Sequence, residues 1–256
     1  MRVKDQLNRT LEFSTIPQRI VSLVPSHTEL IVDLNLNDKL VGITKFCVHP
    51  EHLRKEKTVV GGTKNVHLEK IYALRPDVII CNKEENTPEM VEELGHIAPV
   101  WVSDIKNIED SLEMTYCMGE LFGKSDEAKW INEAVLEQKH SFETFIQDRP
   151  WKKMAYVIWK QPFMAAGSDT FINSLLEINK FDNVITENRY PQVDLHTLKE
   201  ADIVLLSTEP FPFKEYDAQE LERVLQTKVR LVDGEFFSWY GSRLIKAFSY
   251  FRSLEL

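Results

Sequence analysis

Cys47 and His49 lie two residues apart in the segment KFCVHP, and they are the side chains best suited to chemistry. Thiolate and imidazole suit Zn, Co, Cu or Fe, either as a free ion or at the axial position of a chelate. Two ligands do not complete a metal site, so His27 or His67 would have to converge on the pair. The same residues could serve an enzyme, with Cys47 as nucleophile and His49 or His27 as base. No nucleophile elbow, P-loop or dinucleotide fingerprint accompanies them.

Aromatic and cationic residues gather in the segments that follow predicted strands. Exposed Trp and Phe are disfavoured unless they pack or bind, so these segments either contact a flat, partly apolar ligand or pack against the rest of the fold. Cations in an otherwise acidic chain favour an anionic group on the ligand, because guanidinium pairs bidentately with carboxylate or phosphate. The candidate ligand-binding residues are Ser26, Phe46, Cys47, His49, Lys64, Trp159, Lys160, Phe163, Arg189, Tyr190, Phe211, Trp239, Tyr240 and Arg243.

Composition narrows the range of partners. The 256 residues carry a net charge of −9 with no Lys/Arg run, so nucleic acid and anionic membrane surfaces are not expected partners. The three cysteines are odd in number and far apart, which argues against a disulfide framework. No apolar run is long enough to span a membrane. The first 14 residues lack the apolar core of a secretory signal, as expected of a cytoplasmic protein or of a chain whose signal has been removed.

Strand and helix patterns alternate through the first half of the chain. Apolar, β-branched runs predict strands at residues 19–24, 39–44, 77–81 and 99–102. Apolar residues at helical spacing predict helices at residues 26–36, 68–74, 87–96 and 108–122. Ser26 and Glu29 have the spacing of a capping box. The alternation predicts an α/β fold with a mostly parallel sheet covered by helices on both faces.

The same alternation returns after residue 150. Strands are predicted at residues 153–159, 201–207 and 230–232, and helices at residues 169–179, 217–225 and 241–254. Residues 66–71 (VHLEKI), before the strand DVIIC, are similar to residues 193–198 (VDLHTL), before DIVLL. We therefore expect the second half to repeat the first.

One long helix, predicted over residues 125–147, separates the halves. Gly123 ends the preceding helix, and Ser125 can cap the new one. One face carries the apolar residues Ala128, Ile131, Val135, Phe142 and Phe145. At 1.5 Å per residue the helix would span roughly 35 Å, enough to run along two lobes. The expected organisation is an N-terminal lobe (1–123), a connecting helix (124–149) and a C-terminal lobe (150–256).

Taken in order, these segments resemble the ABC-transporter substrate-binding proteins of the helical-backbone class, the class III periplasmic binding proteins. The resemblance is carried by residues 17–26 (PQRIVSLVPS), Glu29, 40–42 (LVG), 68–71 (LEKI), 74–80 (LRPDVII), the long helix, 167–176 and 183–184. Members of this class bind cobalamin, siderophores, haem or metal ions. The resemblance implies two βα lobes joined by one rigid helix, and a ligand held between them with modest closure.

The resemblance also implies the partners. The ligand would be a metal chelate or related anion captured for import, with no intrinsic cofactor, and the protein partner an ABC permease at the periplasm or cell envelope. Family members dock through one exposed acid per lobe. Glu69 matches the first acid, whereas the second falls on His196, where Asp194 or Glu200 could substitute.

Two positions depart from the cobalamin binders of the class, which have tryptophans where this chain has Thr63 and Asn82. Phe163 and Tyr190 keep the aromatic character. The resemblance therefore favours a metal chelate other than cobalamin.

Three alternatives to a transport receptor remain at the level of sequence. The first is a cytoplasmic carrier or sensor of the same fold, and the second is the Cys/His-dependent enzyme described above. The third is an interaction module that uses Phe236, Phe237, Trp239 and Tyr240 as a partner patch, a reading that requires these rings to be exposed.

Overall fold

The computed structural model describes residues 1–254, which form two compact units. Unit 1 contains Met1–Asp104, Glu109–Val135 and Tyr240–Leu244. Unit 2 contains Ile105–Ile108, Leu136–Trp239 and the described part of Ile245–Leu256. The expected N-terminal lobe included Ile105–Ile108 and the expected C-terminal lobe included Tyr240–Leu244, so the structure groups these two short segments differently.

A five-stranded parallel sheet forms the centre of unit 1. Its strands are β3 (Ile20–Ser22), β4 (Leu40–Ile43), β5 (Thr58–Val59), β6 (Val78–Asn82) and β7 (Val100–Ser103), in the order β5-β4-β3-β6-β7. Every residue of β3, β6 and β7 is buried, as expected for a parallel sheet covered on both faces.

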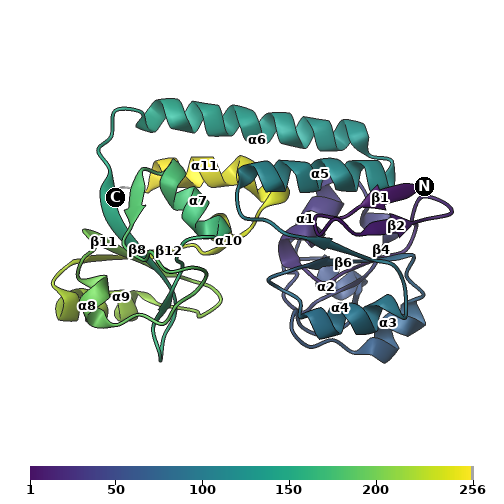
Figure 1. Cartoon of the computed structure of the whole chain (residues 1–256), viewed down its shortest axis with the longest axis horizontal. Helices are drawn as coiled ribbons and strands as arrows, with labels where there is room; N and C mark the ends of the chain where they lie inside the picture. The colour runs from purple at the N-terminus through teal and green to yellow at the C-terminus, as the bar shows by residue number, and fades with distance from the viewer. Residues whose placement is uncertain (255–256) are drawn as a thin grey trace. The chain divides into compact units, whose positions relative to one another are not determined.

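Helices cover the unit 1 sheet on two sides (Figure 1). The helices are α1 (Pro25–Asp33), α2 (Leu53–Glu56), α3 (Leu68–Leu74), α4 (Pro88–Gly95), α5 (Ile108–Phe122) and the first part of α6 (Ser125–Ile146), with a 3-10 turn η1 at Asn37–Lys39. Ile71 of α3 and Met90 and Leu94 of α4 pack in one apolar cluster with the sheet. In Figure 1, α5 and the start of α6 lie on the other side of the sheet from α3 and α4.

Unit 2 is built around a second parallel sheet. Its strands are β8 (Lys152–Trp159), β10 (Phe181–Asn183), β11 (Ile203–Ser207) and β12 (Lys228–Val232) in the order β10-β8-β11-β12, with β9 (Met164–Ala165) antiparallel to β8. Its helices are α7 (Phe171–Ile178), α8 (Leu195–Leu198), α9 (Glu215–Leu225), α10 (Glu235–Ser238) and most of α11 (Leu244–Ser253). Leu198, Leu221 and Leu225 of α8 and α9 pack in one cluster with the sheet. The turn η2 (Gly241–Arg243) belongs to unit 1.

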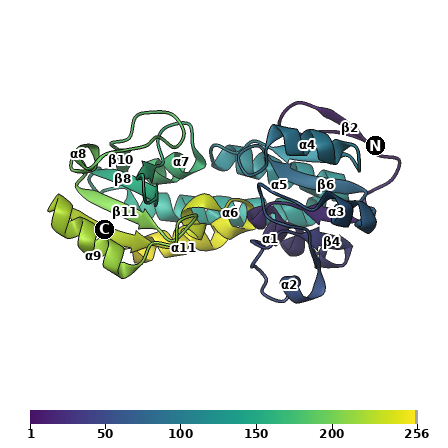
Figure 2. The same cartoon turned by 90° about the horizontal axis from the view of Figure 1, so that it is seen from below.

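The long helix α6 contributes residues to both units, as predicted. Its 22 residues span about 33 Å. Ala128, Ile131 and Val135 are buried in the unit 1 part of α6. The unit 2 part of α6 runs beside α11 (Figures 1 and 2). There Phe142 is buried against Phe248 and Phe251 of α11, with ring centroids 5.8 and 5.9 Å away. The predicted stripe was wrong at Phe145, which is 42% exposed, because Ile146 takes the buried position.

The two units repeat one topology. The order β4-β3-β6-β7 in unit 1 corresponds to β10-β8-β11-β12 in unit 2. In unit 1, Asp77 before β6 donates its amide to Arg19 O (2.8 Å) and accepts the amide of Arg19 on Oδ2 (2.9 Å). In unit 2, Asp202 before β11 makes the same pair of bonds with Lys153, at 2.9 and 2.9 Å. The predicted repeat thus extends to individual hydrogen bonds.

Local details differ from the sequence predictions at two places. An N-terminal antiparallel hairpin, β1 (Arg2–Lys4) with β2 (Thr10–Glu12), was not predicted, because its strands are short and mostly exposed. The capping box at Ser26 was wrong, since α1 begins at Pro25 after the N-cap residue Val24, which makes no side-chain cap. No helix within residues 1–254 is both long and apolar enough to cross a lipid bilayer.

Close approach of α5 and α6 gives a testable prediction. A Cβ atom at Gly119 would lie 2.5 Å from Ala128 Cβ and 3.1 Å from Lys124 O. We expect Gly119→Ala to lower the free energy of unfolding by about 1–3 kcal/mol, because overpacking strains the contact. Gly95→Ala in α4 is the matched control, since no atom lies within 4 Å of the added carbon. Thermal unfolding of both variants makes the test, and equal melting temperatures would contradict the proposed contact.

Candidate ligand-binding site

A buried cluster of uncharged polar groups lies at the carboxyl ends of β6 and β7 in unit 1. Ser103 Oγ, at the end of β7, is 2.8 Å from His27 Nε2 and accepts from Asn82 Nδ2 at 2.9 Å. The Tyr240 hydroxyl makes side-chain hydrogen bonds with Ser26 and Ser103. Carboxyl ends of parallel strands are the usual place for ligands in open α/β sheets. The cluster therefore marks this edge as the unit 1 candidate site.

His27 gives this cluster an unusual electrostatic character. The side chain is fully buried in α1, and Tyr240 meets it edge-on with ring centroids 5.3 Å apart. Burial lowers the pKa of His27 to about 3, so the ring is neutral at physiological pH. Its Nδ1 atom has no hydrogen-bond partner among residues 1–254. The ring therefore stabilises the cluster as a neutral group and not as a cation.

Asn82 connects the cluster to the loop that follows β6. Its Oδ1 accepts the amides of Glu84 and Glu85 at 2.8 and 3.1 Å, and its own amide donates to Asn86 Oδ1 at 2.8 Å. Asn86 in turn donates to Thr63 O at 2.8 Å. These bonds fix the loops after β5 and β6 at the same edge.

Tyr240 and Arg243 were predicted to face a ligand, but the structure places both inside unit 1. They are 7% and 6% exposed. Arg243 Nε donates to Glu29 Oε2 at 2.8 Å, and the amide of Gly241 donates to Ser111 Oγ at 2.9 Å. These contacts fasten Tyr240–Leu244 to α1 and α5, so both side chains serve the fold of the edge.

Cys47 is fully buried, which bears on the metal and enzyme hypotheses. Its Sγ lies 3.1 Å from Thr28 Oγ1 and 3.2 Å from Thr44 Oγ1. Burial raises the pKa of the Cys47 thiol, whereas a nucleophile or metal ligand needs the thiolate. Within residues 1–254 no group of three or more His, Cys, Asp or Glu side chains is placed to hold a metal ion. Cys47 and His49 thus gain no third ligand there.

Phe46 is the exposed aromatic ring of the unit 1 edge. It is 49% exposed, with Lys45 Nζ 5.0 Å from the ring centroid. A Cβ atom on Gly62 would lie 3.3 Å from the ring, so the glycine lets the ring rest against the backbone. Lys64 donates to the backbone oxygen of Glu84, and its charge counteracts the burial that raises the pKa of Glu85.

Unit 2 presents an aromatic group where β8 ends. Trp159 is 40% exposed and lies edge-on to Phe211, with centroids 5.6 Å apart. Phe211 contacts the buried Phe213 at 4.6 Å, and Phe163 packs against the same apolar core. The structure therefore places Trp159, Phe163 and Phe211, three of the candidate residues, at the carboxyl end of β8 and beside the unit 2 core; that they face a ligand stays a prediction.

Two further residues of unit 2 that were predicted to contact a ligand bind other side chains of the protein. Trp239 is 6% exposed, and its Nε1 donates to Glu209 Oε1 at 2.9 Å. Lys160 pairs with Asp217 at 2.6 Å and with Glu220 at 3.4 Å. Phe237, Trp239 and Tyr240 are all buried, so the partner-patch hypothesis was wrong.

Arg189 and Tyr190 form the cationic part of the unit 2 candidates. The guanidinium carbon of Arg189 lies 6.0 Å from the Tyr190 ring centroid, and its Nη1 donates to Asp169 O at 3.3 Å. Both side chains are half-buried. The planar guanidinium of Arg189 thus lies beside an aromatic ring, an arrangement that suits an anionic group.

The two docking candidates differ in their local roles. Glu69 lies in the first turn of α3 with its side chain 76% exposed. Asp194 is the N-cap of α8, where it accepts the amide and hydroxyl of Thr197 at 2.8 and 2.9 Å. The backbone hydrogen bond from Thr197 lowers the pKa of Asp194. Asp194 thus has a structural function that Glu69 does not share.

Sequence reasoning missed Ser103, whose hydroxyl is the shared partner in the buried cluster. The available signal was its position: it is the polar residue that closes the buried strand VWVS. The hydrogen bond between Ser26 and Tyr240 could not be predicted from spacing, because 214 positions separate the two residues in the sequence.

Comparison with known proteins places these features in a family. The sequence profile of a family described as periplasmic binding protein matches residues 20–227. The uncharacterized ABC transporter substrate-binding lipoprotein YvrC of Bacillus subtilis (strain 168) is 24% identical over 258 residues, covering 95% of this chain and 82% of that protein. The vitamin B12-binding protein of Yersinia pestis (strain Pestoides F) is 24% identical over 176 residues, covering 68% of this chain and 62% of that protein, less than two thirds of its length.

A solved structure has the same fold. A periplasmic haem-binding protein from Pseudomonas aeruginosa superposes with a TM-score of 0.80 at 22% identity, covering 92% of this chain and 91% of that one. The predicted fold class is therefore confirmed.

Burial of His27 predicts a specific pH dependence. Its pKa falls from an ordinary 6.5 to about 3 on folding, so the unfolded chain binds the extra proton between these values. The contribution of neutral His27 to the free energy of unfolding is therefore fully present above pH 6.5 and is lost as the pH falls toward 3. Between pH 6 and pH 4 the free energy of unfolding should fall by about 2 kcal/mol less in His27→Gln than in the unchanged protein, as measured by urea unfolding. The exposed His140, changed to Gln, is the control, and identical pH profiles for both variants would contradict the prediction.

The buried Arg243–Glu29 pair predicts coupled stability losses. Arg243→Met leaves the Glu29 carboxylate buried without this cation, which we expect to cost about 3–5 kcal/mol. The double variant Arg243→Met/Glu29→Gln should recover part of that loss, because it removes the uncompensated charge. Urea unfolding of the single and double variants measures the coupling, and simple additivity would refute it.

Proposed function

Because the chain belongs to the periplasmic binding protein family, we propose that it is a solute-binding protein that captures a small-molecule ligand for ABC-type import. The observation that carries the proposal is the match over residues 20–227, which extends through most of both units. The relatives that match over most of the chain have names of binding proteins and not of enzymes. We propose accordingly that the chain performs no chemical step of its own.

The ligand is proposed to be a metal chelate of the siderophore, haem or corrinoid type, or a related anion. Phe46 and Trp159 supply half-exposed aromatic rings at the carboxyl ends of their sheets, which suit a flat, partly apolar molecule. Arg189 supplies a planar cation for a carboxylate. The metal would arrive within the ligand, and no intrinsic cofactor is proposed.

Selectivity within this class is proposed to depend on the unit 1 edge. By the resemblance drawn from the sequence, Thr63 and Asn82 take the places of tryptophans in the cobalamin binders. Asn82 forms hydrogen bonds with Ser103, Glu84 and Glu85. A polar, hydrogen-bonded edge disfavours stacking on a corrin and favours a ligand with oxygen atoms at its rim. This supports a chelate other than cobalamin.

An ABC permease is the proposed protein partner, at the periplasm or cell envelope. Glu69 is the proposed docking acid, because its carboxylate is exposed on the first turn of α3. Asp194 is the weaker candidate, since Thr197 already uses its carboxylate. A receptor of this class would dock through one acid in each unit, and the second acid is the weaker candidate here. This favours the second candidate function, a carrier or sensor of the same fold that passes its ligand to another protein.

Calorimetry with haemin, ferrichrome and cyanocobalamin tests the proposed function. We expect one-to-one binding of at least one metal chelate, with cyanocobalamin the weakest. Trp159→Ala should weaken the affinity about tenfold, because the ring supplies stacking area at the proposed contact. Trp151→Ala is the matched control, since Trp151 is also exposed but precedes β8 at its opposite end. No binding of any of the three compounds would count against a metal-chelate receptor.

A further inference from the structure

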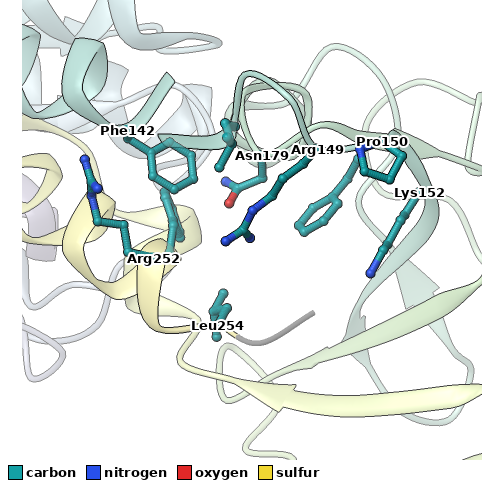
Figure 3. A pocket seen from close by; sticks show the side chains of 10 residues that line it. Phe142, Arg149, Pro150, Lys152, Asn179, Arg252 and Leu254 are labelled. Carbon is teal, nitrogen blue, oxygen red and sulfur yellow. The ribbon is translucent and has the colours of Figure 1, made fainter. Parts of the chain in front are cut away.

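Unit 2 contains a pocket at the end of its sheet opposite to Trp159. The cavity of about 580 Å³ is formed by the end of α6, the start of β8, the turn between α7 and β10, and the end of α11 (Figure 3). Lys152 lines it and begins β8, whereas Trp159 ends that strand. Seven residue steps along a strand span roughly 23 Å. The pocket is therefore separate from the ligand contacts proposed above.

Three cations line this pocket, although the chain as a whole is acidic. They are Arg149, Lys152 and Arg252, and none of the ten lining residues is Asp or Glu. Elsewhere in unit 2 cations sit beside carboxylates, as Lys160 does with Asp217 and Lys106 with Asp169. Figure 3 shows the guanidinium of Arg252 directed away from the hollow, so Arg149 and Lys152 supply its positive charge. Among the described residues that line the pocket there is no carboxylate, and its electrostatics are therefore those of an anion site.

Phe145 holds two of these cations in place. The guanidinium carbons of Arg149 and Arg252 lie 4.5 and 4.8 Å from its ring centroid, and Arg252 Nη2 donates to Ser141 Oγ at 2.7 Å. Stacking on a ring leaves the N–H edge of a guanidinium available for an oxyanion. Phe145, which is 42% exposed, thus contacts both guanidinium groups from the surface of α6.

Helix capping does not account for the cations. The carbonyl oxygens of Gln147 and Arg149, at the end of α6, already accept hydrogen bonds from Lys180 Nζ. Figure 3 shows Arg149 extending into the hollow, with Asn179 and Phe142 on one side and Lys152 on the other. The charged nitrogen atoms of Arg149 and Lys152 are thus directed toward the pocket.

Apolar side chains form most of the remaining wall and indicate the kind of anion that the pocket would bind. Phe142, Ile146, Phe181 and Phe251 line the pocket and are each less than 9% exposed. The volume falls in the range of about 300–1,000 Å³ typical of small-molecule sites. We propose that this pocket is a second binding site, for a small organic phosphate or carboxylate whose apolar part packs against these rings.

Calorimetry with phenyl phosphate and inorganic phosphate, at constant ionic strength, tests the proposal. We expect one-to-one, saturable binding of phenyl phosphate, tighter than that of inorganic phosphate because only the former fills the apolar wall. Lys152→Gln and Arg149→Gln should each weaken phenyl phosphate about tenfold, through loss of a charge-assisted hydrogen bond. Lys153→Gln is the matched control: it removes the same charge from the next residue of β8, which does not line the pocket, and should change the affinity less than about twofold.

Three outcomes would overturn the second site. They are non-saturable binding, equal affinities for the two phosphates, and equal losses in Lys152→Gln and Lys153→Gln. Lys152→Gln should also leave the affinity for a bound metal chelate unchanged, because Lys152 begins the strand that Trp159 ends. Failure to bind any chelate would leave the phenyl phosphate result intact, so the two proposals fail separately. Thermal unfolding of each variant checks that a lost affinity does not reflect an unfolded chain.

Discussion

The ion pair between Arg243 and Glu29 is the interaction on which the unit 1 edge depends. Both side chains are less than 10% exposed, so each charge would be costly without the other. The pair fixes Tyr240–Leu244, a segment from the end of the chain, onto α1 near the start of the chain. Tyr240 then completes the hydrogen bonds of Ser26 and Ser103. The polar edge is therefore assembled only when the last segment of unit 1 is in place.

The fold was predictable because the spacing of apolar residues along each strand and helix determines which side chains are buried, and that spacing is a property of the local sequence. The apolar runs of β6 and β11 and the 3/4 spacing of α6 each determine which face is buried, and both the parallel sheets and the long helix were predicted. The N-terminal hairpin was missed because its strands bury little. Ser26 was assigned as a cap from its spacing alone, whereas its hydroxyl bonds to Tyr240, a partner that no local pattern reveals.

The candidate site was less predictable, because residue type does not tell which side chains find partners within the protein. Trp159 and Trp239 both lie in aromatic segments, yet Trp159 stays 40% exposed while Glu209 accepts the indole N–H of Trp239. Arg189 and Arg243 are equivalent in the sequence patterns, but Arg243 is buried in an ion pair with Glu29, whereas Arg189 is half-buried. These differences arise from contacts between residues far apart in the chain, which composition and spacing leave undetermined.

Comparison of the repeated units shows where they have diverged. Asp77 and Asp202 bond to the backbone at the start of β3 and of β8, so the amino ends of these two strands are held by the same pair of hydrogen bonds. In unit 1 the residue before the braced Arg19 is Gln18, whose amide also donates to Asp77. In unit 2 the residue before the braced Lys153 is Lys152, which lines the cationic pocket. The residue before the shared pair of hydrogen bonds, Gln18, therefore bonds within the fold in unit 1. Its counterpart in unit 2, Lys152, lines the pocket proposed as a second binding site, and the same hydrogen bonds hold its backbone in place.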